Sequence, residues 1–123
     1  MAALTPKEIV NAYIDAIAAR DFQRARGLLA NGRFATRSPI SAFESADAYV
    51  TDISRVGPIL EGIERRRVFA DGDEVCVILD YITRMDRRQV TPVVHLMRVE
   101  DWKFVFIETF FDARGYVALF QVD

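Results

Sequence analysis

The hydrophobic period of the chain changes once, near the middle, and this change limits the folds it can adopt. Up to about residue 56, apolar residues recur every three to four positions, which is typical of amphipathic helices. From about residue 63 onward, stretches rich in β-branched and aromatic residues alternate with short turn sequences, which is typical of antiparallel strands. Helices followed by strands indicate an α+β domain with its helices on one face of an antiparallel sheet.

Three helices are expected in the first half of the chain. The first spans residues 6–20 and begins at a capping box formed by Thr5 and Glu8. A second, shorter helix begins after Asp21, which is a good N-cap residue. The third is expected over about residues 44–56, because a Gly-Pro pair follows and ends it.

Four strands are expected in the second half, over residues 63–69, 75–83, 93–99 and 104–112. The three later strands are joined by tight turns and predict an antiparallel meander. A curved sheet covered by three helices encloses a cone, and the interior of that cone is the natural place for a ligand pocket.

Composition excludes several classes of protein. The 123 residues suit one domain, taken as residues 1–123, and 16 basic against 18 acidic residues give a net charge of −2. This balance argues against nucleic-acid binding, and one Cys and one His leave neither a disulfide nor a thiolate zinc site. No apolar run is long enough to cross a membrane, and the N-terminus does not resemble a secretory signal. We therefore expect a cytoplasmic protein without metal or cofactor.

Two stretches resemble the nuclear transport factor 2-like superfamily. Residues 13–21 (YIDAIAARD) resemble its first helix, where an aromatic residue precedes an Asp that opens helix two. Residues 95–103 (HLMRVEDWK) resemble its hairpin, and Phe111-Asp112 resembles the end of its last strand. The superfamily includes ketosteroid isomerases, SnoaL-like polyketide cyclases and limonene epoxide hydrolases. The resemblance implies a cone-shaped fold over nearly the whole chain and a homodimer formed through the outer face of the sheet.

Comparison with ketosteroid isomerases implies roles for two residues. Tyr13 falls where that family keeps the tyrosine of its oxyanion hole, and His95 falls where it keeps a protonated aspartic acid. The family's general-base aspartate belongs in the loop after helix two, but residues 34–39 contain no carboxylate here. The family's route of proton transfer is therefore not carried over to this chain.

Strand alternation predicts which side chains face the pocket. On the strand of His95, the inward set is Val93, His95, Met97 and Val99. On the last strand the resemblance implies that the inward set is Phe106, Glu108, Phe110 and Asp112. An even-residue turn near Arg87 would place Asp80 opposite His95, with an inward set of Ile78, Asp80 and Ile82.

The predicted catalytic residues are Tyr13, His95, Asp80 and Glu108. Tyr13 and His95 would bind a carbonyl oxygen, and a carboxylate beside His95 would let it act as an acid or base near neutral pH. Asp80, Glu108 or Asp112 would move the proton. The predicted ligand-binding residues are Phe34, Met97, Phe106, Phe110 and Asp112. A structural explanation also exists for each, such as a salt bridge from Glu108 to Arg84 or Arg37.

Three functions remain open: an acid–base enzyme acting on a small apolar carbonyl compound, a ligand-binding module without a proton relay, and an association domain. A homodimer is expected in each case, because the predicted outer strand faces are apolar. The residues assigned to those faces are Val75, Val77, Leu79, Tyr81, Val105, Ile107 and Phe111. An apolar segment near the C-terminus, residues 116–120, could cover the pocket mouth or the dimer contact.

Overall fold

The helices begin where the capping residues predict. In the computed structural model, which describes residues 4–114, the Oγ1 of Thr5 accepts from the backbone N–H of Glu8 at 3.2 Å, and the Glu8 carboxylate accepts from the Thr5 N–H at 2.9 Å. Asp21 and Ser45 cap the next two helices. The helices are α1 (Pro6–Ala18), α2 (Phe22–Gly27), α3 (Ala46–Ile53) and the 3-10 helix η1 (Ser54–Ile59). Residues 116–120 lie outside the described residues.

The sheet contains six strands in the order β2-β1-β6-β5-β4-β3. They are β1 (Ala35–Arg37), β2 (Ala42–Phe43), β3 (Leu60–Asp71), β4 (Glu74–Arg84), β5 (Arg88–Glu100) and β6 (Lys103–Phe111). Strands β4 to β6 form the expected antiparallel meander, β3 extends it by one antiparallel strand, and β1 joins β6 in parallel. Strands β1 and β2 were not predicted, because their short segment is rich in turn-forming residues.

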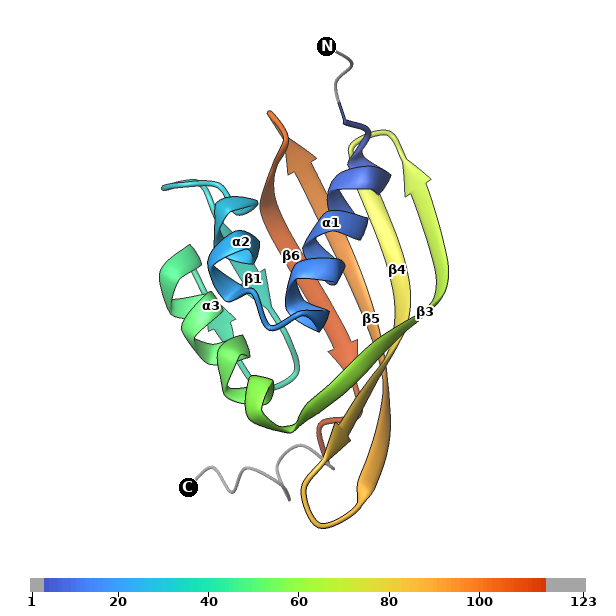
Figure 1. The fold of residues 1–123 in the computed structure, drawn as a ribbon. Helices are drawn as coiled ribbons and strands as arrows, with labels where there is room; N and C mark the ends of the chain where they lie inside the picture. The colour runs from blue at the N-terminus through green and yellow to red at the C-terminus, as the bar shows by residue number, and fades with distance from the viewer. Residues whose placement is uncertain (1–3, 115–123) are drawn as a thin grey trace.

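The helices cover one face of the curved sheet (Figure 1). Helix α1 lies across β4 to β6, and α2 and α3 lie on the side of β1, so the predicted α+β class is confirmed. No helix within residues 4–114 combines the length and apolar character needed to cross a membrane.

The β4–β5 hairpin corrects one predicted register. Arg84 pairs with Arg88, so the loop holds three residues instead of an even number. Residues of the same parity therefore face each other, with Val77 opposite His95 and Asp80 opposite Pro92. Burial follows this register, and the inward residues of β4 are Val75, Val77, Leu79, Tyr81 and Thr83. The prediction that Ile78, Asp80 and Ile82 face inward is wrong.

A β-bulge in β6 shows that the predicted facing of this strand is also wrong. Arg98 pairs with Phe106 and Val99 pairs with Phe104, which leaves Val105 as an extra residue. A bulge of one residue reverses the facing of everything after it. The inward residues are consequently Phe104, Ile107, Thr109 and Phe111. The predicted inward orientation of Phe106, Glu108 and Phe110 is wrong, whereas that of His95, Met97 and Val99 on β5 is confirmed.

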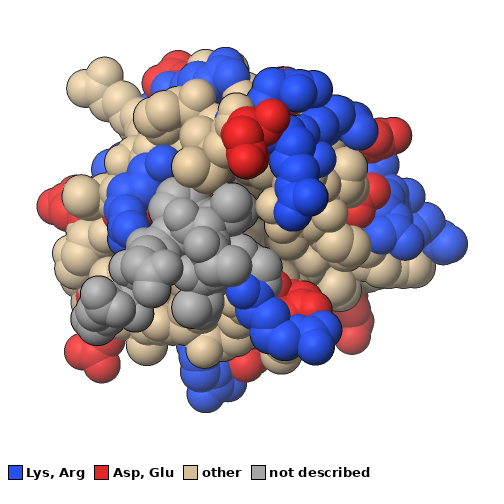
Figure 2. All heavy atoms as spheres, turned by 90° about the horizontal axis from the view of Figure 1, so that it is seen from below, with Lys and Arg blue, Asp and Glu red and all other residues tan. Residues whose placement is uncertain are grey.

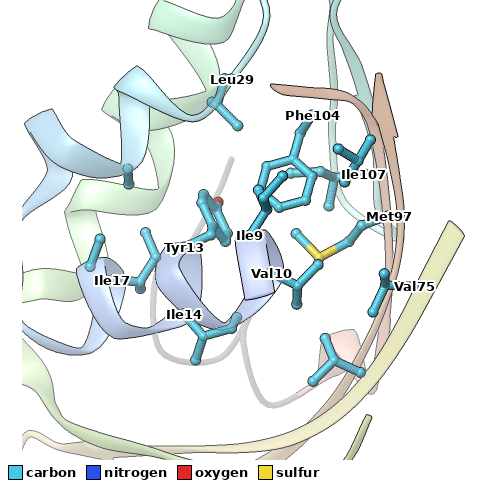
Figure 3. Packing of buried hydrophobic residues seen from close by; sticks show 14 of the residues in the cluster. Ile9, Val10, Tyr13, Ile14, Ile17, Leu29, Val75, Met97, Phe104 and Ile107 are labelled. Atoms are coloured by element: carbon cyan, nitrogen blue, oxygen red, sulfur yellow. The ribbon is translucent and has the colours of Figure 1, made fainter. Parts of the chain in front are cut away.

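The core lies between α1 and the sheet. The ring of Tyr13 meets that of Phe104 edge-to-face, with centroids 5.3 Å apart and planes at 70° (Figure 3). Aliphatic side chains from α1 and the strands surround this pair, among them Ile9, Val10, Met97 and Ile107. This packing fixes the position of the phenol at the end of the core.

Replacing Phe104 with Ala should lower the free energy of unfolding by about 3–5 kcal/mol, because the ring is fully buried and its loss leaves a cavity beside Tyr13. Urea unfolding measures the change. The control is Phe69→Ala, at a ring that is 48% exposed on β3, which should cost about 1 kcal/mol or less. Equal losses in the two variants would contradict this assignment of the core.

Candidate functional site

A cavity of about 330 Å³ lies between the helices and the inner face of the sheet. It is near the lower end of the range for small-molecule sites, roughly 300–1,000 Å³. Its lining is largely apolar, from residues such as Ile17, Phe22, Ile53, Val56, Leu60, Val93 and Phe111. The polar residues buried in its wall are Tyr13, Tyr49, Thr36, Thr83 and His95, with Tyr81 and Thr109 partly buried beside them.

His95 is held between two hydroxyl groups. Its Nδ1 lies 2.8 Å from the Oγ1 of Thr109, and its Nε2 lies 3.4 Å from the hydroxyl of Tyr81. Only 4% of the residue is exposed, and burial lowers the pKa of His95 to about 4. The ring is therefore neutral at pH 7. The expectation of a carboxylate beside His95 is wrong, because Asp80 is on the outer face and pairs with Arg66 at 3.3 Å.

Two further tyrosines meet at the cavity. The hydroxyl of Tyr13 donates to that of Tyr49 at 3.5 Å. Burial raises the pKa of Tyr49 to about 12 and raises the pKa values of Tyr13 and Tyr81 well above the ordinary value. All three phenols therefore remain protonated at pH 7. The Tyr49 oxygen accepts a hydrogen bond, while its own O–H has no acceptor among the described residues, so it is free to donate to a ligand.

The charged side chains that line the cavity each have an ion partner. Arg37 pairs with Glu108 at 2.9 Å, and Asp52 accepts from Arg55 at 3.4 Å. Asp112 pairs with Arg114, and the hydrogen bonds from Arg114 lower the pKa of Asp112 to about 2. On the face seen from below, Lys and Arg likewise lie beside Asp and Glu (Figure 2). The charges at the cavity are thus neutralised in pairs.

The structure brings three of the predicted site residues to the cavity: Tyr13, His95 and Asp112. Asp80, Glu108, Phe106 and Phe110 are on the outer face of the sheet, for the register reasons given above. The salt-bridge explanation for Glu108 is confirmed, with Arg37 as its partner. Met97 is buried in the core, and Phe34 is buried against the ring of Tyr49, so neither lines the cavity.

Residues that the sequence reasoning missed come from α3, η1, β4 and β6. Tyr49, Asp52, Ile53 and Val56 all line the cavity, and their spacing of three, four and seven residues marks one helix face. That signal was available in the sequence. Tyr81 and Thr109 were assigned to the outer face by the wrong parity. Within residues 4–114, no group of three or more His, Cys, Asp or Glu side chains could hold a metal ion.

These features define a class of protein: an α+β cone whose helices and sheet enclose an apolar pocket. The model of the SnoaL-like domain family matches residues 10–107, so the chain belongs to that family. The predicted membership of the nuclear transport factor 2-like superfamily is thereby confirmed. A comparison with curated protein sequences finds no match.

Solved structures share the fold at low sequence identity. An NTF2-like protein of unknown function from Cytophaga hutchinsonii is 20% identical, with a TM-score of 0.78 over 94% of this chain and 96% of that one. An LEH-like epoxide hydrolase from M. tuberculosis is 20% identical, with a TM-score of 0.76 and 93% of each chain covered. TerC, co-crystallised with polyporic acid, is 17% identical, with a TM-score of 0.78 over 96% and 100%.

The low pKa of His95 predicts how stability depends on pH. Between pH 6.5 and 4 the unfolded chain binds a proton at this residue and the folded chain does not, so stability falls as the pH falls. The loss should reach about 3 kcal/mol at pH 4 and be absent above pH 7. Urea unfolding across this range, compared between the wild type and His95→Gln, isolates the effect because the chain has one His. Parallel curves for the two proteins would contradict it.

Proposed function

We propose that the cavity binds a small, uncharged and largely apolar molecule that carries a hydrogen-bonding oxygen such as a carbonyl. The observation that supports this most strongly is a set of four polar groups, the buried Tyr13, Tyr49 and His95 and the partly buried Tyr81, which are all neutral at pH 7. An ion moved into such surroundings would lose its hydration and find no opposite charge, so a neutral ligand is favoured.

The phenol pair provides a donor for the ligand oxygen. Tyr13 donates its hydrogen to Tyr49, which polarises the Tyr49 hydroxyl and strengthens its own O–H as a donor. Tyr13 is 1% exposed and packs against Phe104, so it acts behind Tyr49 and holds it in place. In this arrangement Tyr49 contacts the ligand directly, and the apolar walls bind the rest of the molecule.

A second candidate function is acid–base catalysis of the isomerase, cyclase or hydrolase type. Asp52 favours it, because α3 brings this carboxylate to the cavity although the loop at residues 34–39 has none. Its Oδ1 lies 3.4 Å from a guanidinium nitrogen of Arg55, and a carboxylate at a cavity wall is a candidate general base. Similar structures include an LEH-like epoxide hydrolase and a putative SnoaL-like polyketide cyclase, which supports small-molecule chemistry in this fold.

Binding of two matched bicyclic probes tests the proposal. 1-Indanone carries a carbonyl and indane does not, so the wild type should bind 1-indanone more tightly, by roughly three- to ten-fold for one net hydrogen bond. Tyr49→Phe removes the donor without changing the volume greatly, and should reduce that preference while leaving indane affinity unchanged. NMR titration measures both. If neither probe binds, or if both bind equally to the wild type, the proposal is wrong.

We also propose that a second copy of the chain covers the outer face of the sheet. Within residues 4–114, no helix lies on this face (Figure 1). In the corrected register this face is mostly apolar, although the ion-paired Asp80 and Glu108 also lie on it. Val105 is the one residue of the predicted outer set that remains there. The half-buried members are Cys76, Ile78, Ile82, Val94, Leu96, Val105 and Phe106, and Phe110 is 49% exposed. Water contact with so large an apolar area is unfavourable.

Phe110→Asp should convert a dimer into a monomer, because it places a charge within the apolar outer face. Light scattering at micromolar concentration should give twice the 14.0 kDa chain mass for the wild type and the single-chain mass for the variant. Trp102→Asp is the control, since Trp102 is also exposed but lies in the β5–β6 turn at a positive φ that Asp tolerates. A wild-type mass of 14.0 kDa would refute the dimer.

A further inference from the structure

A chain of three hydrogen-bonding side chains crosses the inner face of the sheet. Tyr81 is on β4, His95 is on β5, and Thr109 is directly opposite His95 on β6. The Tyr81 hydroxyl lies 3.4 Å from Nε2 of the ring, and Thr109 Oγ1 lies 2.8 Å from Nδ1. The rings of Tyr81 and His95 also meet edge-to-face, with centroids 6.3 Å apart. All three residues line the cavity.

A neutral imidazole can satisfy this chain in two ways, because it has one N–H and one acceptor nitrogen. When the proton is on Nε2, the ring donates to Tyr81 and accepts from Thr109, and the Tyr81 O–H is left free to donate to a ligand. When the proton is on Nδ1, the ring donates to Thr109 and accepts from Tyr81, and the Tyr81 oxygen is left to accept from a ligand.

We propose that His95 is a positioning residue that reverses the hydrogen-bond polarity of Tyr81, so that the cavity binds ligands whose polar atom is either an acceptor or a donor. This inference rests on the proposed binding function. It extends the ligand class from carbonyl compounds to neutral molecules that offer an N–H or O–H at the same place.

The other phenols of the cavity are held differently. The Tyr49 oxygen already accepts from Tyr13, so Tyr49 is set as a donor. His95 itself is almost fully buried and has both nitrogens occupied, so it reaches a ligand through the hydroxyl groups that it contacts. Thr109 is suited to the end of the chain because a hydroxyl can donate or accept by rotating.

The single histidine makes the tautomer directly measurable. In protein labelled with ¹⁵N at its histidine, the two ring-nitrogen shifts report the tautomer without ambiguity, because the chain has one His. Because burial keeps the ring neutral at pH 7, the doubly protonated imidazolium does not contribute to the spectrum. Indole, a donor, should favour the proton on Nδ1. 1-Indanone, whose carbonyl oxygen would accept from Tyr81 as well as from Tyr49, should favour the proton on Nε2. Indane should leave the free-state spectrum unchanged.

Thr109→Val tests the far end of the chain. Valine has nearly the shape of threonine but accepts no hydrogen bond, so a proton on Nδ1 would be buried without a partner. The ring should then keep its proton on Nε2 with every probe. Indole should lose its advantage over indane, roughly three- to ten-fold in the wild type, while 1-indanone keeps its own. Thr51→Val, the same change at an exposed position of α3, is the control.

The outcomes separate this inference from the function on which it rests. If no probe binds the wild type, the proposed binding function fails. If indole and 1-indanone both bind but the ring shows the same tautomer with each, only the polarity reversal is overturned. Should Thr109→Val not fold, Tyr81→Phe replaces it: the tautomer must then stop responding to both probes, and a response that persists refutes the role of Tyr81.

Discussion

The site depends on one constraint: the phenols and the imidazole at the inner end of the cavity are shielded from water. The edge-to-face contact of Tyr13 with Phe104 seals this end against the core, and His95 is enclosed by the strands around it. Because of this burial, the imidazole of His95 is neutral and the three phenols remain protonated at pH 7. Hydrogen bonds are the polar interactions left at this end, so specificity depends on which atom donates and which accepts.

The fold could be predicted from the sequence because its signals are local and repeated. The capping box at Thr5 and Glu8 fixes where α1 begins, and the turn sequences of the second half mark the meander. The orientation of His95 was also accessible, since β5 runs without interruption and its buried residues alternate regularly from Val93 to Val99. Strands β1 and β2 were missed because two or three residues are too few to show a period.

The site was predicted less well, because a single residue decides which face a side chain occupies. The three-residue loop between Arg84 and Arg88 moved Tyr81 inward and Asp80 outward. The extra residue Val105 did the same for Thr109 and Glu108. Neither could be read from hydrophobicity, since both faces of these strands are apolar. Asp52 and Tyr49 are different, because the helical spacing on α3 carried that information and was not used.

The bulge at Val105 divides β6 into two parts whose facing is set independently. Phe104, before it, packs in the core beside Tyr13, and Thr109 and Phe111, after it, line the cavity. If a related chain kept this residue but formed a regular strand without the bulge, the residues after it would face the other way, and Glu108 would replace Thr109 in the wall. A change of strand geometry at one position, without any change of residue type, thus offers evolution a direct route from a neutral pocket to one that holds an ionisable carboxyl group.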